Sequence, residues 1–149
     1  MNSEAGGPYL QAALFCERVL QEKDNVLTIV RIIDRLTITA AGLQPPEEMP
    51  PSNVNVFLLV ILKSGFIRAR HTLRVIPTTP LGRTLPEMSA GVLLEGEDRG
   101  VNVILNVQLL ASEEGVYWFQ ILFEEQLLTR VPLRILYQRV TQGGLFEPQ

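Results

Sequence analysis

Reactive side chains are scarce in this chain, which has a single cysteine, Cys16, and a single histidine, His71. One cysteine cannot form an intramolecular disulfide, which agrees with a reducing compartment. No cysteine and histidine residues stand at metal-ligand spacing, and the three aspartates are scattered, so we expect no metal, calcium included, and no cofactor. A binding or structural role is therefore favoured over catalysis.

Long apolar runs are missing as well, so that no segment is expected to cross a bilayer as a helix. Glu4 stands where a signal peptide would carry a basic residue, and we expect a cytoplasmic protein without membrane contact. The net charge of −3, from 13 basic and 16 acidic residues, gives no electrostatic reason to bind nucleic acid. Arginine outnumbers lysine strongly, since only Lys23 and Lys63 are lysines.

The chain also lacks a convincing long amphipathic helix, which argues against parallel α/β folds, because each parallel crossover would need one. What it has instead is short apolar runs between turn residues. The clearest example is residues 101–139, where three alternating runs (101–109, 116–123 and 127–139) predict antiparallel strands joined by tight turns. Gly115 can adopt the positive φ that the first of these turns often needs.

Earlier in the chain, turn signals separate further short strands. Ser64-Gly65 predicts a two-residue hairpin that joins residues 54–63 to 66–77. A helix over residues 12–21 competes with a strand over residues 9–20, but the β-branched run that follows offers that strand an immediate partner. The remaining predicted strands are residues 26–33, 36–39 and 92–94, and the proline-containing segments 41–52 and 78–86 are predicted loops.

Together these segments predict an all-β fold, an antiparallel two-sheet β-sandwich of about eight strands that is immunoglobulin-like or C2-like. The length suits one domain with a core of its own. We assign residues 9–140 to this domain, residues 1–8 to a disordered N-terminus and residues 141–149 to a flexible tail.

The most distinctive surface feature is a row of arginines. The alternation in residues 66–77 places Arg68, Arg70 and Arg74 on one side, opposite His71 and its apolar neighbours. Such a row suits an acidic partner strand or an anionic ligand, although pairing with glutamates or plain solvation would explain it too.

A second candidate region surrounds Pro132, which cannot donate a hydrogen bond to a neighbouring strand and so indicates an edge or a bend. Arg130 and Arg134 flank it and would add a second basic patch. Because edge strands recruit other chains, this half of the protein suggests strand addition or self-association.

Three other hypotheses stay open. The aromatic side chains of Tyr117, Trp118 and Tyr137 could form a stacking platform for a carbohydrate or another small ligand. Cys16 and His71 could form the nucleophile pair of a hydrolase if the fold brings them together. The Gly143-Gly144 pair is similar to the processed tail of ubiquitin-like precursors, but a β-grasp domain would also need a helix across its sheet.

Residues 10–20, 26–37, 115–119 and 132–135 resemble corresponding segments of an uncharacterised family of small bacterial proteins. The first hairpin of that group commonly turns on Asp-Gly, where this chain has Asp24-Asn25, and asparagine also tolerates positive φ. The resemblance implies a compact β-sandwich of unknown function and transfers no catalytic residue. From the residues themselves we expect a non-enzymatic domain that binds a protein partner or a second copy of itself.

Overall fold

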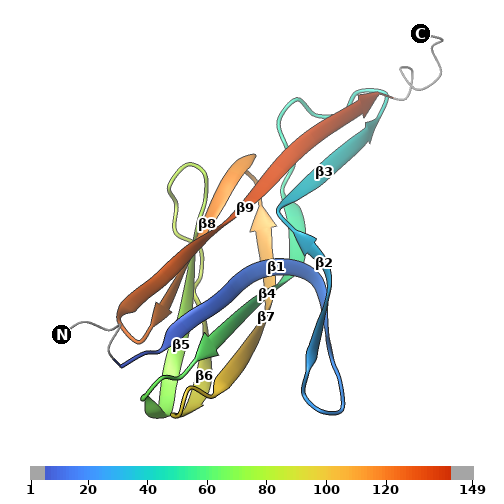
Figure 1. Cartoon of the computed structure of the whole chain (residues 1–149). Coiled ribbons are helices and arrows are strands. Elements are labelled where there is room, and N and C mark those ends of the chain that lie inside the picture. Colours follow the sequence, from blue (N-terminus) through green and yellow to red (C-terminus); the bar gives the residue numbers. More distant parts are fainter. Residues whose placement is uncertain (1–5, 142–149) are drawn as a thin grey trace.

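Figure 1 shows the fold, a computed structural model that describes residues 6–141. The described residues form nine β-strands and no helix. The strands are β1 (Tyr9–Gln21), β2 (Leu27–Ile33), β3 (Arg35–Gly42), β4 (Ser52–Lys63), β5 (Arg68–Thr78), β6 (Met88–Glu95), β7 (Gly100–Ala111), β8 (Gly115–Phe123) and β9 (Gln126–Thr141). The predicted all-β class is confirmed, and β1 is a strand rather than a helix. Residues 1–5 of the predicted disordered N-terminus (1–8) and residues 142–149 of the predicted tail (141–149) lie outside the described part.

The strands form two sheets, one of four strands in the order β2-β1-β4-β7 and one of five in the order β3-β9-β8-β5-β6. The four-stranded sheet is antiparallel, whereas β3 lies parallel to β9 and makes the five-stranded sheet mixed. One sheet curls into a half-barrel. The predicted arrangement in two sheets is confirmed, and nine strands are found where about eight were expected. The prediction of a plain antiparallel immunoglobulin-like sandwich was wrong, because one sheet is mixed and curled. Side-chain alternation reports the burial of a strand's two faces but carries no information about the direction of its neighbour.

The predicted hairpin at Ser64-Gly65 was also wrong, because β4 and β5 belong to different sheets. The chain reverses there but crosses from one sheet to the other. The backbone N–H of Ser64 donates to the carbonyl oxygen of Arg99 at 2.9 Å, and its hydroxyl donates to that of Gly96 at 3.0 Å. These bonds tie the crossing to the β6–β7 connection, which explains why the buried Ser64 is satisfied without a hairpin partner.

The turn at residues 112–115 crosses between the sheets in the same way, since β7 pairs with β4 while β8 pairs with β5 and β9. The three predicted strands of residues 101–139 therefore exist, but only β8 and β9 form a hairpin. A tight turn shows where the chain reverses direction. Which sheet the following strand joins depends on where that strand buries its apolar side.

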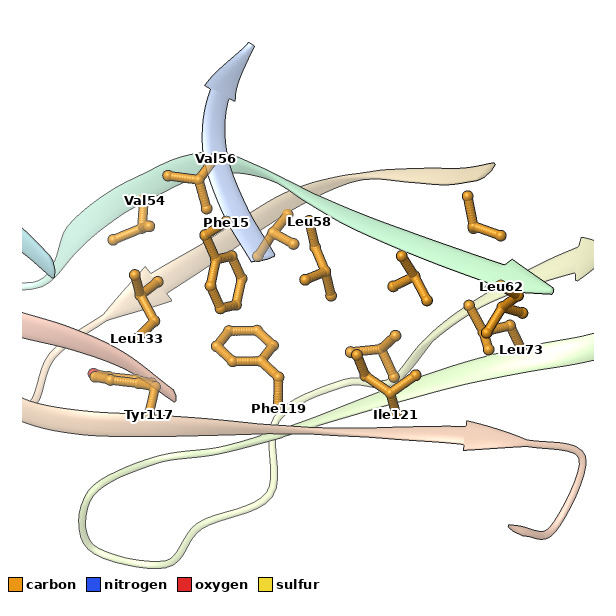
Figure 2. Close-up of a cluster of buried hydrophobic side chains, with 14 of the residues drawn as sticks. Phe15, Val54, Val56, Leu58, Leu62, Leu73, Tyr117, Phe119, Ile121 and Leu133 are labelled. Atoms are coloured by element: carbon orange, nitrogen blue, oxygen red, sulfur yellow. The ribbon is translucent and has the colours of Figure 1, made fainter. Parts of the chain in front are cut away.

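The core lies between the two sheets, and the strands that cross it alternate as predicted (Figure 2). Phe15 of β1 and Phe119 of β8 meet edge to face, with ring centroids 4.8 Å apart. Each fully buried large apolar side chain contributes roughly 1.5–3 kcal/mol relative to an exposed one. The inward rows include Val54, Val56, Leu58, Val60 and Leu62 of β4, Leu73 and Val75 of β5, Tyr117 and Ile121 of β8, and Leu133 and Ile135 of β9.

Candidate functional site

The two predicted arginine patches lie on one face of the molecule, the outer face of the five-stranded sheet. Leu73 and Val75 are buried in the core, so the alternation of β5 turns Arg70 and Arg74 outward. Leu133 and Ile135 are buried in the same way, and β9 therefore turns Arg130, Pro132 and Arg134 outward. Strand β8 lies between β5 and β9. The tertiary structure thus places both patches on the outer face of one sheet, with Arg134 near the level of Trp118 and Arg70 toward the opposite end of β5.

Arg68 is exposed too, but the alternation around it differs from the prediction. Ala69, which was expected to face inward, is exposed and has a φ of 84°, a left-handed conformation. This irregularity interrupts the start of β5. Arg68 lies near Glu97, with Nη2 and Oε1 3.9 Å apart.

Trp118 of β8 occupies the middle of this face, opposite Pro132 of β9 and Thr78 of β5. Its side chain is 37% exposed, and the guanidinium carbon of Arg130 lies 4.5 Å from the centroid of its ring. This is the geometry of a cation–π contact. Trp118 is therefore held in place by a neighbour that belongs to the predicted arginine set.

The arginines of this face differ in their partners. Arg74 binds Glu87 with two hydrogen bonds, 2.9 Å from Nε and 3.1 Å from Nη2. These bonds raise the pKa of Arg74 and lower that of Glu87. By contrast, Arg70 and Arg134 are exposed and have no carboxylate partner among residues 6–141.

Arg35 completes the set and was missed by the sequence analysis. It is the register partner of Arg134 in the parallel β3–β9 pair, and its exposed side chain lies on the outer side because Leu36 packs against the core. No carboxylate of the described residues pairs with it. No local signal could have found it, because β3 and β9 are far apart in the sequence. We call Arg35, Arg70, Trp118, Arg130 and Arg134 the arginine face.

The structure does not support a Cys16–His71 pair. Cys16 lies in β1 of the four-stranded sheet and is fully buried, and this burial raises the pKa of its thiol. His71 lies in β5 of the other sheet. Its Nε2 donates to the carbonyl oxygen of Arg68 at 2.9 Å, and its Nδ1 lies 3.3 Å from Oε1 of Glu124. The ring of His71 also packs beside Phe123, with centroids 4.9 Å apart. Its neighbours thus hold the ring in place.

The three aromatic residues of the stacking hypothesis do not form a platform. Tyr117 is buried in the core, and its hydroxyl donates to the carbonyl oxygen of Glu113 at 2.7 Å. The hydroxyl of Tyr137 donates to the carbonyl oxygen of Pro46 at 2.6 Å. Only Trp118 presents part of its ring on the outer face. Gly143-Gly144 lies outside the described residues.

Neither a metal-binding cluster nor a membrane-spanning helix is found in the part of the chain that the structure describes. Within residues 6–141, no three histidine, cysteine, aspartate or glutamate side chains could together hold a metal ion. The same residues contain no helix long and apolar enough to span a membrane.

These observations define the class of the protein, a small all-β domain of two sheets with an arginine-rich outer face. The chain belongs to the family of unknown function DUF6941, whose model matches residues 11–136. A search of curated protein sequences gives no match. The resemblance to an uncharacterised family is therefore confirmed at that level, and the bacterial origin it implied stays a prediction.

Proposed function

We propose that this domain is a non-enzymatic binding module that uses the arginine face to hold an acidic segment of a partner protein. The observation that carries the proposal is that Arg35, Arg70 and Arg134 are exposed without a carboxylate partner in residues 6–141. Guanidinium groups bind carboxylates through two parallel hydrogen bonds, so these positions suit the side chains of aspartate and glutamate.

Trp118 and Arg130 strengthen the proposal. Tryptophan and arginine dominate the residues whose loss weakens protein interfaces most, and here they contact each other on an exposed sheet face. A second copy of the chain could supply the acids, because its Glu-rich turns are exposed. Self-association is thus a form of the same proposal. The net charge of −3 favours a protein partner over nucleic acid, and nothing in the composition calls for a cofactor or a membrane surface.

Titration with a fluorescein-labelled peptide of alternating glutamate and leucine tests this proposal. Wild-type protein is expected to bind the peptide, and Trp118, the single tryptophan, should report binding through its emission. The double variant Arg70→Glu/Arg134→Glu should lose about tenfold or more in affinity, since one charge-assisted hydrogen bond contributes roughly 1.5–3 kcal/mol. Light scattering at several concentrations shows whether the chain also binds itself.

Arg18→Glu is the matched control, because Arg18 is exposed on β1 of the other sheet. It changes the net charge by half as much per molecule but leaves the arginine face intact. Equal affinity of wild type and the double variant would refute the proposal. A free-energy loss in Arg18→Glu half as large as that in the double variant would show that net charge alone is at work.

A small-ligand or carbohydrate module is the second candidate, and the exposed ring of Trp118 favours it. Arg130 lies over that ring, so a sugar would have to share the ring or displace the guanidinium. A change of Trp118 emission with simple sugars but not with the acidic peptide would favour this candidate. Hydrolase activity by Cys16 finds no support in the geometry.

A further inference from the structure

Exposed strand edges usually carry features that prevent pairing with other chains, such as charged residues, prolines and irregular backbone. Three edges of this fold have such features. Arg31 in β2 has a left-handed φ of 57°, β3 begins with Arg35, and the part of β9 that has no neighbour beyond β8 contains Pro132. The predicted edge at Pro132 is therefore present, and proline and flanking arginines protect it.

β7 is an edge strand without this protection. It runs for 12 residues, Gly100–Ala111, and contains no charged residue and no proline. It pairs with β4 on one side, and no strand of the described residues pairs with it on the other. β6, the neighbouring edge strand of the five-stranded sheet, likewise lacks proline and lysine. Long edges with such a composition are available for pairing with an added strand.

The hydrogen bonds show which backbone groups of β7 are free. The N–H of Ser64 donates to the carbonyl oxygen of Arg99, and the same register continues through Leu62 and Val101. Because alternate residues of a strand bond to the same neighbour, the odd-numbered residues of β7 bond to β4. The even-numbered residues therefore direct their N–H and C=O groups to the open side; these are Asn102, Ile104, Asn106, Gln108 and Leu110.

Open space lies along this edge. A hollow of about 580 Å³ separates β6 from residues 100–104 of β7. A second hollow of about 480 Å³ lies between residues 107–110 of β7 and the segment that leads into β6. β6 and β7 lie next to each other in Figure 1, and they follow each other directly in the chain. The unpaired edge is therefore reachable at both of its ends, with Asn106 between the two hollows.

The side chains around the hollows indicate what would fit. Leu93, Ile104 and Leu110 are 50%, 38% and 59% exposed and line them. The charged groups there already have partners within the chain: Arg99 pairs with Glu95, Arg74 with Glu87 and Arg83 with Glu113. An occupant would meet apolar side chains, free backbone groups and paired charges in the lining itself, while the unpaired guanidinium of Arg70 lies on the next strand beside Leu93.

We propose that the open edge of β7 accepts an extended, uncharged segment of a partner polypeptide as an added strand. Main-chain hydrogen bonds to the even-numbered residues would hold the segment, and its alternate apolar side chains would cover Leu93, Ile104 and Leu110. This site takes a ligand of different chemistry, although it borders the arginine face at Arg70, the register partner of Leu93. Its test uses an uncharged peptide and leaves Arg70 unchanged, so it is independent of the function proposed above.

The probe is a fluorescein-labelled peptide of alternating valine and threonine, and its control is the same peptide with every second amide N-methylated. Anisotropy should rise with the first peptide and stay unchanged with the second, because N-methylation removes the donors that strand pairing needs. This comparison uses unaltered protein and does not depend on the folding of a variant.

Two variants at one position locate the site. Asn106→Pro removes an N–H that points away from β4 and should weaken binding about tenfold or more, whereas Asn106→Ala keeps that N–H and should bind as wild type does. Arg134→Glu, which changes a residue of β9 far from β7, should leave this binding unchanged. Circular dichroism spectra confirm that each variant is folded.

Equal binding of both peptides, or of both Asn106 variants, would overturn the proposal. A second outcome would also overturn it: the wild-type protein is a dimer, Asn106→Pro makes it a monomer, and the peptide does not bind wild type. The occupant of the edge would then be a second copy of the chain. Loss of acidic-peptide binding in the arginine variants would leave this result untouched.

Discussion

At the scale of single residues, Cys16 shows how burial determines what a reactive group can do. The thiol lies on β1 opposite Ile32 of β2 and Phe57 of β4, and it is fully buried. Burial raises its pKa, and the hydrogen bond to the backbone of Arg18 offsets this only in part. The thiolate is the reactive form, so Cys16 in the folded protein behaves as a small apolar residue.

We therefore expect Cys16 to resist modification in the native state. Reaction with Ellman's reagent at neutral pH should be slower than that of the unfolded chain by about 100-fold or more, because the thiol must first be exposed by an opening of the structure. Absorbance of the released thiolate measures the rate, and the same protein in concentrated guanidinium is the control. Rapid stoichiometric reaction of folded protein would contradict the burial of Cys16.

The arginines illustrate what a sequence reveals at this scale. Alternation along residues 66–77 and around Pro132 correctly placed Arg70, Arg74, Arg130 and Arg134 on outward faces. It could not tell that Glu87 pairs with Arg74 while Arg70 has no such partner. The Arg74–Glu87 salt bridge depends on the path of the loop before β6, and the alternation of residues along a strand does not predict that path.

At the scale of elements, the connections between strands determine which sheet each strand joins. Strand positions followed from apolar alternation and were largely predicted. The crossing at Ser64-Gly65 was not, since the same turn residues serve a hairpin and a change of sheet. Gly65 has a φ of 59°, and a Cβ atom there would lie 2.7 Å from the carbonyl oxygen of Gly6 and 3.0 Å from the ring of Tyr9.

Gly65→Ala is therefore expected to destabilise the protein. The left-handed backbone alone costs roughly 1–2 kcal/mol for a residue with a Cβ atom, and the close approach to Gly6 adds to this. Gly91→Ala is the control, because a Cβ at Gly91 meets nothing closer than 3.9 Å, the Nη1 of Arg70. Urea unfolding curves measure both. Equal unfolding midpoints would show that the crossing does not need glycine.

At the scale of the whole molecule, ion pairs fasten the loop between β5 and β6 to the rest of the fold. Arg83 in this loop binds Glu113 in the β7–β8 turn, and the backbone N–H of Leu81 donates to the same carboxylate at 3.0 Å. Arg74 of β5 binds Glu87 at the end of the loop. The loop therefore joins elements of both sheets through charged contacts.

These contacts predict how stability depends on pH. Burial alone would raise the pKa of Glu113, but the hydrogen bonds from Arg83 and Leu81 outweigh it, so that the pKa falls below its ordinary value of 4.5. The pKa of Glu87 is lowered too, because Glu87 accepts hydrogen bonds from Arg74. A lowered folded-state pKa stabilises the protein above the unfolded-state pKa, and this contribution is lost as pH falls below about 4.5 through the lower folded value.

Urea unfolding midpoints measured between neutral pH and pH 3 should therefore drop below about pH 4.5. Glu113→Gln should be less stable than wild type at neutral pH, and the difference should shrink as the pH falls, because the wild-type carboxylate is then protonated too. A difference that stays constant over this range would show that the charge of Glu113 contributes nothing.

The sequence by itself determined the all-β class, most of the strand positions and which side chains face the core, because these follow from the two-residue period of a strand and the burial of its apolar side. Only the tertiary structure decided that β3 runs parallel to β9, that Arg35 lies beside Arg134, and that β7 has an open edge. The physical reason is that strand pairing is made by backbone groups that every residue carries. Which strands meet therefore depends on how the whole chain buries its apolar faces, and no local pattern records it.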